Sequence, residues 1–226
     1  MFENNNMSTP VVTGVAPTFF GKVMTFFALA VFCSALGVYT TMTYFMEYFF
    51  QIPWLMYALF AVELIIIFTS RLWRTKSPLN RVLFVAFTFI TGVTVAPLIA
   101  ILAESTAGVT ILTQALLATG LMFTATALIG WTTKYDLSGL RGFLLMALIG
   151  MIIVGIMGIF IPWGNTAEMI YSGIGVLLFS AYTMYDFQKI KKYPEDAYID
   201  AALALYLDIF NMFLYILRLI MALNRR

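Results

Sequence analysis

The chain contains no histidine and a single cysteine, Cys33, among its 226 residues. The absence of histidine excludes histidine-based catalytic triads, haem ligation through histidine and zinc sites with histidine ligands. One cysteine can form neither a disulfide framework nor a cysteine cluster for a metal. There is also no glycine-rich phosphate loop of the Walker type, which argues against transport driven by ATP. The sequence therefore does not indicate an enzyme or a resident cofactor.

Charged residues are scarce as well. They make up 11% of the chain, whereas a soluble domain carries about 25%. Apolar residues account for 62%, and the mean hydropathy is +0.93. A soluble fold of this length has too little interior to bury so much apolar surface, so the composition predicts an integral membrane protein surrounded by the lipid bilayer. A net charge of +2 is too small to indicate nucleic-acid binding.

Apolar runs of about 20 residues, the length that a transmembrane helix needs, recur along the whole chain. We therefore predict an all-α membrane protein in which residues 18–226 form one domain of seven transmembrane helices, preceded by a polar N-terminal tail, residues 1–17. The seventh run is more polar than the other six. The runs are Phe19–Tyr44, Ile52–Trp73, Val82–Ala103, Val109–Trp131, Leu140–Trp163, Ala167–Phe187 and Ile199–Leu223.

Basic residues are distributed unevenly over the connections between these runs. With a cytoplasmic N-terminus, the cytoplasmic segments carry ten Lys or Arg residues and the opposite loops carry none. Because Lys and Arg are enriched on the cytoplasmic side, this bias predicts a cytoplasmic N-terminus for a multi-pass protein. The absence of histidine favours a bacterial source and thus the inner membrane. The ten residues are Lys22, Arg71, Arg74, Lys76, Arg81, Lys134, Arg141, Lys189, Lys191 and Lys192.

The seventh run leaves two alternatives open. If it crosses the membrane, Arg225 and Arg226 lie outside, against the rule; if it re-enters, they remain inside. Its 25 residues are enough to span a bilayer, which favours a crossing.

Two features predict the local geometry of the helices. Pro97 lies inside the third run and is expected to kink that helix. Gly150, Gly155 and Gly158 in the fifth run are expected to allow close packing between helices, as small residues do in membranes.

Four ionisable residues fall inside the apolar runs, where they are costly and need a structural or functional reason. They are Glu63, Asp186, Asp208 and Arg218. The two aspartates are the most informative, because residue 197 lies midway between them in the hairpin of the last two runs. In a symmetric hairpin with helical arms both would lie about 16 Å from the turn. The carboxyl groups are therefore expected to face each other below the cytoplasmic surface.

Two close carboxyl groups resist being ionised together, so the pair can share one proton near neutral pH. When both are ionised they offer hard oxygen ligands for a divalent cation such as Ca²⁺, and Asn211, three residues after Asp208, can add a carbonyl oxygen. The alternative is that each aspartate is neutral and fastens helix to helix. For Glu63, a structural tie between helices is the favoured interpretation.

Four segments carry a resemblance to a known family. Residues 179–190, FSAYTMYDFQKI, and 204–214, ALYLDIFNMFL, resemble the signature of the Bax inhibitor-1 family, also called the transmembrane Bax inhibitor motif family. Residues 91–98, TGVTVAPL, and 134–138, KYDLS, agree with it. The similarity extends over essentially the whole chain from the first helix onward.

The resemblance implies a seven-helix fold in which the last helix is enclosed by the other six. It implies a pH-sensitive calcium leak channel, in which Asp186 and Asp208 form the sensing pair and Arg74 latches onto them in the closed state. The glutamate of the family's second helix falls on Glu63. The sequence departs from the family in having Phe187 where threonine is frequent, and in a shorter linker between the aspartates than some bacterial members have.

The expected function is thus a passive leak of Ca²⁺ that responds to protons. A second hypothesis is a modulator that binds a membrane AAA protease, with the tail, residues 1–17, as the handle. A third, an intramembrane aspartyl hydrolase, is disfavoured because the Gly-x-Gly-Asp context of presenilin-type enzymes is missing before Asp186 and Asp208.

Overall fold

The computed structural model describes residues 17–52, 54–161 and 164–225, and every regular element in these ranges is helical. The predicted tail lies outside the described residues except for Pro17, where the first helix begins. The elements are α1 (Pro17–Thr40), a π-helical segment (Thr41–Phe45), α2 (Met46–Gln51), α3 (Leu55–Phe68), α4 (Ser70–Trp73), α5 (Leu79–Ala103), α6 (Thr106–Thr132), a 3-10 turn (Leu137–Gly139), α7 (Leu140–Phe160), α8 (Asn165–Ile190) and α9 (Tyr198–Asn224).

Six helices of the described chain are long and apolar enough to cross a membrane. The first is longer than predicted, because α1 continues through the π-helical segment into α2 and gives a span of 34 residues, Thr18–Gln51. The other five are formed by α5, α6, α7, α8 and α9, close to the predicted runs. The helix of α5 runs on through Pro97. The prediction of a multi-pass helical membrane protein is confirmed.

The predicted count of seven spanning helices is not confirmed, because the second run does not form one continuous helix. It is interrupted at Thr69, which separates α3, with 14 residues, from α4, with four. Side chains at the break donate hydrogen bonds to carbonyl groups of α3. The Thr69 hydroxyl donates to the Ile65 carbonyl at 2.6 Å, and the Trp73 indole donates to the Ile66 carbonyl at 3.1 Å. At about 1.5 Å per residue α3 rises only about 21 Å, less than the hydrocarbon thickness of about 30 Å.

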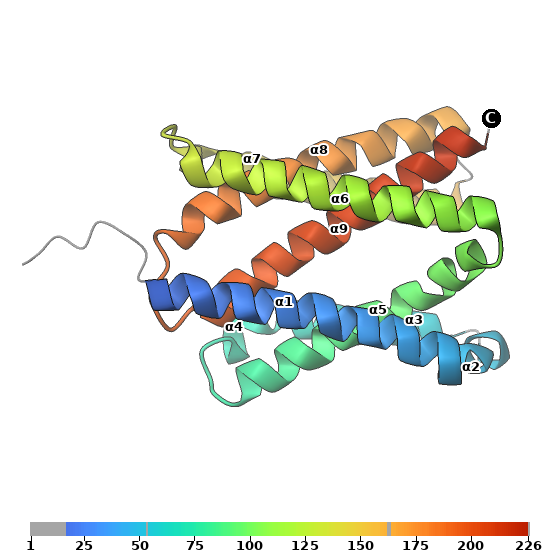
Figure 1. The fold of residues 1–226 in the computed structure, drawn as a ribbon, viewed down its shortest axis with the longest axis horizontal. Coiled ribbons are helices and arrows are strands. Elements are labelled where there is room, and N and C mark those ends of the chain that lie inside the picture. Colours follow the sequence, from blue (N-terminus) through green and yellow to red (C-terminus); the bar gives the residue numbers. More distant parts are fainter. Residues whose placement is uncertain (1–16, 53, 162–163, 226) are drawn as a thin grey trace, which may run out of the picture.

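The last helix, α9, lies between two groups of helices, with α6, α7 and α8 on one side and α1, α3 and α5 on the other (Figure 1). It packs most extensively against α8, then against α6 and α1, and less against α5. From 198 to 222 its residues are buried or half-buried, with Arg218 as the exception. In contrast, α3 packs on α5 and α7 packs on α8. The helix α9 thus lies between the two groups, whereas its enclosure by all six other helices stays a prediction.

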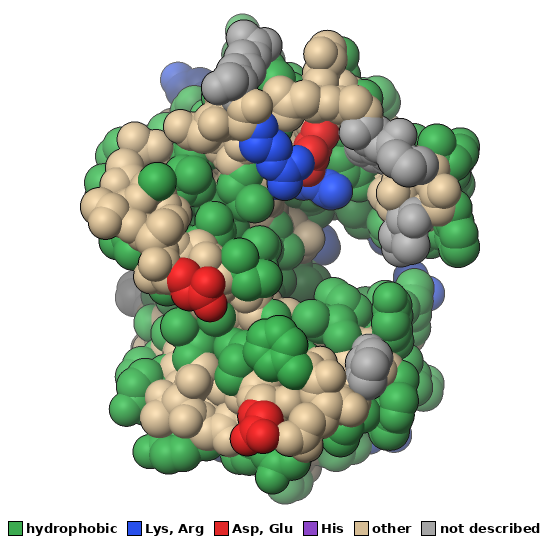
Figure 2. Space-filling model, turned by 90° about the vertical axis from the view of Figure 1, so that its right-hand side faces the viewer, with side chains coloured by type: hydrophobic (Ala, Val, Ile, Leu, Met, Phe, Trp, Pro, Cys, Tyr) green, Lys and Arg blue, Asp and Glu red, His purple; other side chains and the backbone are tan. Residues whose placement is uncertain are grey.

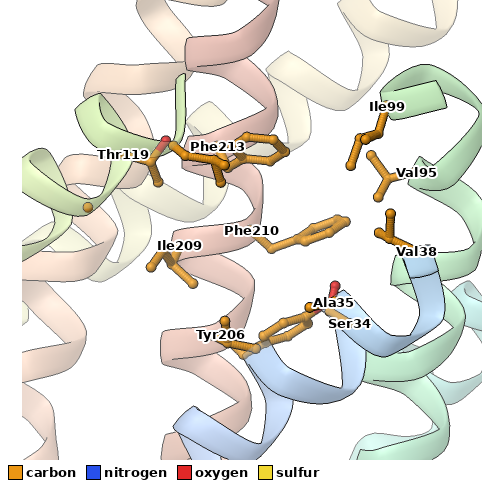
Figure 3. A pocket seen from close by; sticks show the side chains of 13 residues that line it. Ser34, Ala35, Val38, Val95, Ile99, Thr119, Tyr206, Ile209, Phe210 and Phe213 are labelled. Atoms are coloured by element: carbon orange, nitrogen blue, oxygen red, sulfur yellow. The ribbon is translucent and has the colours of Figure 1, made fainter. Parts of the chain in front are cut away.

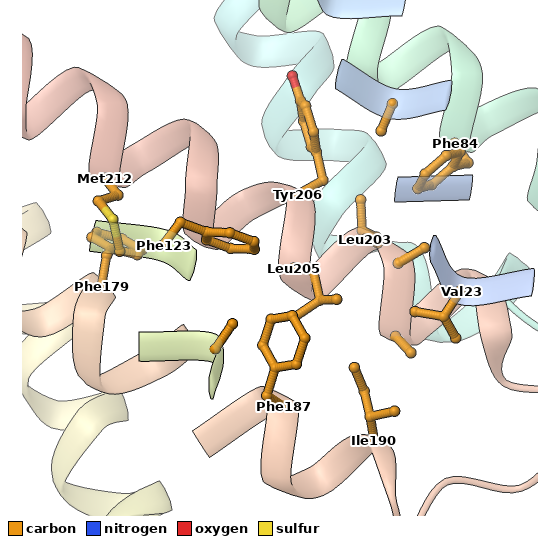
Figure 4. Packing of buried hydrophobic residues seen from close by; sticks show 14 of the residues in the cluster. Val23, Phe84, Phe123, Phe179, Phe187, Ile190, Leu203, Leu205, Tyr206 and Met212 are labelled. Atoms are coloured by element: carbon orange, nitrogen blue, oxygen red, sulfur yellow. The ribbon is translucent and has the colours of Figure 1, made fainter. Parts of the chain in front are cut away.

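The apolar core surrounds α9 (Figure 4). Leu205 and Tyr206 of α9 are among its largest fully buried side chains. Phe187, which stands where the family often has threonine, is buried and meets Phe123 of α6 edge to face, with ring centroids 5.8 Å apart. This aromatic pair joins α6 to α8 beside α9, so the unusual residue has a packing role.

The helices α1 and α5 cross closely. A side chain on Gly92 would collide with the backbone of Ser34, and one on Gly37 with the backbone of Phe89. The prediction for the glycines of α7 is wrong for Gly150, which has no atom within 4 Å of an added Cβ. The reason is that α7 lies at the periphery of the bundle and packs mainly on α8.

The charged residues divide the bundle into two ends. We call the end where α1, α5, α7 and α9 begin the basic end, because the ten basic residues named above lie at or near it. At the opposite end, shown in Figure 2, acidic side chains lie apart from one another and basic side chains adjoin one of them. That one is Glu168, which pairs with Arg218 at 3.2 Å and Arg225 at 2.9 Å. The helix α9 therefore crosses the whole bundle.

Candidate functional site

The predicted aspartates lie in the hairpin of α8 and α9, which differs from the symmetric hairpin expected from the sequence. The connection comprises residues 191–197, so its midpoint is residue 194 and not residue 197. Asp186 precedes the end of α8 by about one turn, whereas Asp208 lies ten residues into α9. The hairpin is therefore not symmetric about residue 197, and the equal depth of the two aspartates stays a prediction. The premise of that prediction, that both arms are helical up to residue 197, fails because α8 ends at Ile190.

Both aspartates are nevertheless buried together. Asp186 is 8% exposed and Asp208 is 3% exposed. The Asp186 carboxyl group lies close enough to Asp208 to act on it electrostatically, and Tyr182 of α8 is close to both. The Oδ2 atom of Asp208 is buried and has no hydrogen-bond partner in the described part of the chain. A buried carboxyl oxygen without a partner is rare and calls for an explanation, such as a bound proton, a water molecule or an ion.

A lysine that the sequence reasoning used only for topology adjoins this pair. The Lys189 Nζ atom lies 4.0 Å from Oδ1 of Asp186 and 4.9 Å from the ring centroid of Tyr193. The spacing of three residues on one helix was a signal for this contact that the sequence already contained. Lys189 therefore supplies a cation at the entrance to the pair from the basic end.

Arg74, the predicted latch, contacts a third aspartate. Its Nη1 atom donates to both carboxyl oxygens of Asp200 in the first turns of α9, at 3.1 and 3.0 Å. Asp200 lies eight residues before Asp208, about 12 Å along the helix, and acts electrostatically on Asp186. In this arrangement the guanidinium is thus held by Asp200, a carboxylate that sequence reasoning missed.

The surroundings of Arg74 explain its position. The preceding residue, Trp73, is 2% exposed and anchors α4, while Asn80 donates from Nδ2 to the Arg74 carbonyl at 3.1 Å. Tyr193, in the connection before α9, is half-buried and hydrogen-bonds Asp200. Burial and the Asp200 carboxylate raise the pKa of the Tyr193 phenol. The phenol therefore stays a neutral donor, and Asp200 keeps two partners.

The loop between α6 and α7 is fastened to the same end of α8. Gln188 accepts from the Leu137 amide at 2.8 Å and donates to the Tyr135 carbonyl at 2.7 Å. Asp136 accepts from the Ser138 amide at 3.0 Å, and this bond lowers the pKa of its exposed carboxyl group. The KYDLS segment is thus held by Gln188, which follows Asp186 by two residues in α8.

The remaining predicted residues make contacts with other groups than the pair. Glu63 of α3 accepts from the Thr94 hydroxyl of α5 at 2.8 Å, in keeping with a tie between helices. Asn211 donates to the Leu207 carbonyl at 2.7 Å within α9. Thr91, three residues before Thr94, shares a hydrogen bond with Tyr206 of α9. The TGVTVAPL segment therefore links α3 to α9.

The expected Ca²⁺ site at Asp186 and Asp208 stays a prediction. Ca²⁺ takes six to eight oxygen ligands. In the ranges that the structure describes, three or more acidic side chains do not come together in a way that can hold a metal ion.

Fold and site together define a multi-pass helical membrane protein whose last hairpin buries two interacting aspartates, with a cation-bearing cluster at its basic end. The chain belongs to the Bax inhibitor-1 family: the family model described as inhibitor of apoptosis-promoting Bax1 matches residues 16–226. The resemblance of the four segments is thereby confirmed.

Relatives occur in bacteria and in plants. An uncharacterised protein of Campylobacter jejuni is 29% identical over 225 residues, covering 100% of this chain and 94% of its own length. A membrane protein of Streptococcus pyogenes is 32% identical, covering 89% of this chain and 91% of its own length. The BI1-like protein of Arabidopsis thaliana is 33% identical over 171 residues, covering 74% of this chain and 65% of its own. The similarity to the two bacterial proteins therefore covers most of each chain.

Proposed function

We propose that the protein is a pH-sensitive calcium leak channel of a bacterial inner membrane, with its basic end in the cytoplasm. The observation that carries this proposal is the buried, unpartnered Oδ2 atom of Asp208 beside Asp186, in a bundle of membrane-spanning helices. Ionisable groups at such positions are expensive, and in membrane proteins they commonly mark ion or proton pathways. Because the described residues include no built metal site, a leak down the Ca²⁺ gradient fits better than storage.

The proton is the proposed control. Two neighbouring carboxyl groups in a poorly solvated site share one proton more readily than they carry two charges. Loss of the shared proton leaves two negative charges close together, and a nearby cation would stabilise them. Lys189 stands 4.0 Å from Asp186, and Arg74 is held on Asp200. Either a protein cation or Ca²⁺ can then neutralise the pair, and this competition couples pH to flux.

Arg74 is proposed to act as the latch by exchanging between carboxylates. At low pH the protonated pair leaves Arg74 on Asp200, as in this structure. At higher pH the ionised pair attracts the guanidinium, which closes the basic end. The Arg74–Asp200 pair is partly exposed, with side chains 40% and 24% accessible, and exposed ion pairs are weak enough to exchange.

Calcium flux in vesicles tests the sensing pair. Purified protein is reconstituted into liposomes that contain a Ca²⁺ indicator, and influx is measured from pH 5 to 8. We expect the flux of the wild type to change several-fold over this range, and Asp186→Asn or Asp208→Asn to flatten the profile because the shared proton is lost. Asp136→Asn is the matched control, since Asp136 is exposed at the same end and should leave the profile unchanged.

The outcome without flux is equally informative. If folded wild-type protein passes no Ca²⁺ at any pH, the leak is rejected and the aspartates are structural. The second hypothesis, a modulator of a membrane AAA protease, then predicts that the chain co-purifies with such a protease and that deleting residues 1–16 abolishes the association.

The variant Asp200→Asn tests separately whether Arg74 acts as the latch. This change removes the charge that holds Arg74 in the present structure, so the guanidinium is released toward the Asp186–Asp208 pair. A cation beside the pair favours its ionised form, and the closure of the channel should therefore move to lower pH, by about half a unit to one unit for a partly screened charge. An unchanged midpoint, with flux still sensitive to Asp208→Asn, would reject Arg74 as the latch and retain the sensor.

A further inference from the structure

A lateral cavity lies in the bundle, between α1, α5, α6 and α9, away from the acidic pair. Its volume is about 340 Å³, within the range of pockets for small ligands. Figure 3 shows Tyr206, Ile209, Phe210 and Phe213 of α9 along one wall, with side chains of α1 and α5 opposite them. Four helices thus contribute to one hollow, and α9 contributes the aromatic wall.

The mouth of the cavity faces the surface that the bilayer covers. Its lining includes Val31 of α1, 42% exposed, and Leu116 of α6, 60% exposed, together with the exposed Gly120. All three lie well inside helices long and apolar enough to span a membrane. At this depth hydrocarbon, and not water, surrounds the protein.

The polar atoms that line the cavity do not require a polar ligand as a hydrogen-bond partner. The Tyr206 hydroxyl is hydrogen-bonded to Thr91 and lies beside Ser34. The Thr119 hydroxyl donates to the Ala115 carbonyl at 2.7 Å. The rest of the lining is aliphatic, aromatic or glycine, and it includes no charged residue. A cation or a lipid headgroup would lose its hydration here without gaining partners, so the chemistry of the wall selects a hydrocarbon.

We propose that this cavity is a binding site for one acyl chain of a membrane lipid, which enters from the bilayer between α1 and α6 and packs against Phe210 and Phe213 of α9. The site is separate from the Asp186–Asp208 pair, and the proposal does not depend on calcium flux. The ligand that contacts this side of α9 is therefore a lipid of the surrounding bilayer.

Lipid photo-crosslinking tests the proposal. The protein is reconstituted with a phosphatidylcholine that carries a diazirine near the end of one acyl chain, and the adducts are mapped by mass spectrometry. We expect adducts on Ile209, Phe210 and Phe213, which are only half-buried by protein in the cavity and do not lie at the outer surface. Adducts on the exposed residues of α7, such as Phe143 and Met146, serve as the internal standard for ordinary lipid contact.

A plugged variant provides the decisive comparison. Gly120→Leu places a side chain in the mouth, where an added Cβ meets no atom within 4 Å. Adducts on α9 should fall at least fivefold while those on α7 remain. Gly150→Leu is the matched control, since Gly150 is equally free of neighbours and lies in α7. Val31→Phe narrows the mouth from α1 and replaces the first variant if that protein does not fold.

Three results would overturn the proposal. The first is an absence of adducts on α9 in the wild type although α7 is labelled. The second is α9 labelling that persists in both plugged variants. The third is α9 labelling that falls as much in the control Gly150→Leu as in Gly120→Leu, because the loss would then not come from plugging the mouth.

Discussion

Single residues decide how the charges of this membrane protein are arranged. Asp200 holds Arg74, and Glu168 holds both Arg218 and Arg225, so the basic side chains of both ends are paired with acidic ones. Spacing along the chain predicts the contact of Lys189 with Asp186, because the two lie on one helix. It does not predict the contact of Arg74 with Asp200, which are 126 residues apart in the sequence.

At the same scale, Gly92 is expected to be the least tolerant glycine. In Gly92→Ala the new methyl group meets the Ser34 backbone, which cannot rotate away, so α1 and α5 must separate. Overpacking of this kind should lower the free energy of unfolding by about 3 kcal/mol. Gly120→Ala is the control, with no atom within 4 Å of the new group and a gain in helix propensity of up to about 1 kcal/mol.

Thermal unfolding of the two variants in the same detergent measures this difference. The Gly92→Ala protein should unfold at a clearly lower temperature than the wild type, and the Gly120→Ala protein at the same or a higher one. Equal midpoints for both variants would show that the crossing of α1 and α5 relaxes without cost.

At the scale of elements, the hairpin of α8 and α9 organises the basic end. Its α8 arm carries Asp186 and, two residues later, Gln188, which holds the loop between α6 and α7. Its α9 arm carries Asp200 and Asp208. The KYDLS segment and the FSAYTMYDFQKI segment are thus neighbours in space, although about 50 residues separate the contacting residues in the sequence. Sequence reasoning found both segments by resemblance, but not that one fastens the other.

We expect Gln188→Ala to release the loop between α6 and α7 from α8. The change removes the acceptor of the Leu137 amide and the donor to the Tyr135 carbonyl, and each lost bond is worth about 1 kcal/mol. Hydrogen exchange of the Leu137 amide should accelerate about fivefold to tenfold. Gln51→Ala, which removes a side-chain contact with Glu47 at the opposite end, is the control and should leave the loop unchanged. Unaltered exchange at Leu137 would mean that the loop is held by other contacts.

At the scale of the whole molecule, the charge distribution and the crossing of α9 predict which residues face each side of the membrane. The ten basic residues named in the sequence analysis lie at or near one end, and Asn224 lies at the other, together with Arg218 and Arg225. Since cytoplasmic segments are enriched in Lys and Arg, the basic end should face the cytoplasm and the end of α9 the opposite side.

Cysteine labelling in intact cells checks this arrangement. In a Cys33→Ala background, Asn224→Cys should react with a membrane-impermeant maleimide, and Lys76→Cys should react only in inverted vesicles. Both positions are exposed, and both should react after solubilisation. Reaction of both from the same side of the membrane would contradict the crossing of α9.

The sequence by itself determined that this is a multi-pass helical membrane protein, that its basic residues are biased along the chain, and that Asp186 and Asp208 are the unusual residues. These properties follow from composition, from the length of apolar runs and from family motifs, all of which are read along the chain. They required no knowledge of which helices touch.

Only the tertiary structure decided the rest. It broke the second run at Thr69 and moved the turn of the last hairpin, because the ends of helices within an apolar run are not marked by the hydropathy pattern. It placed Arg74 on Asp200 and the close crossing at Gly92, since both depend on how distant helices meet. The cavity beside α9 likewise exists only because four helices leave a space that no single one of them defines.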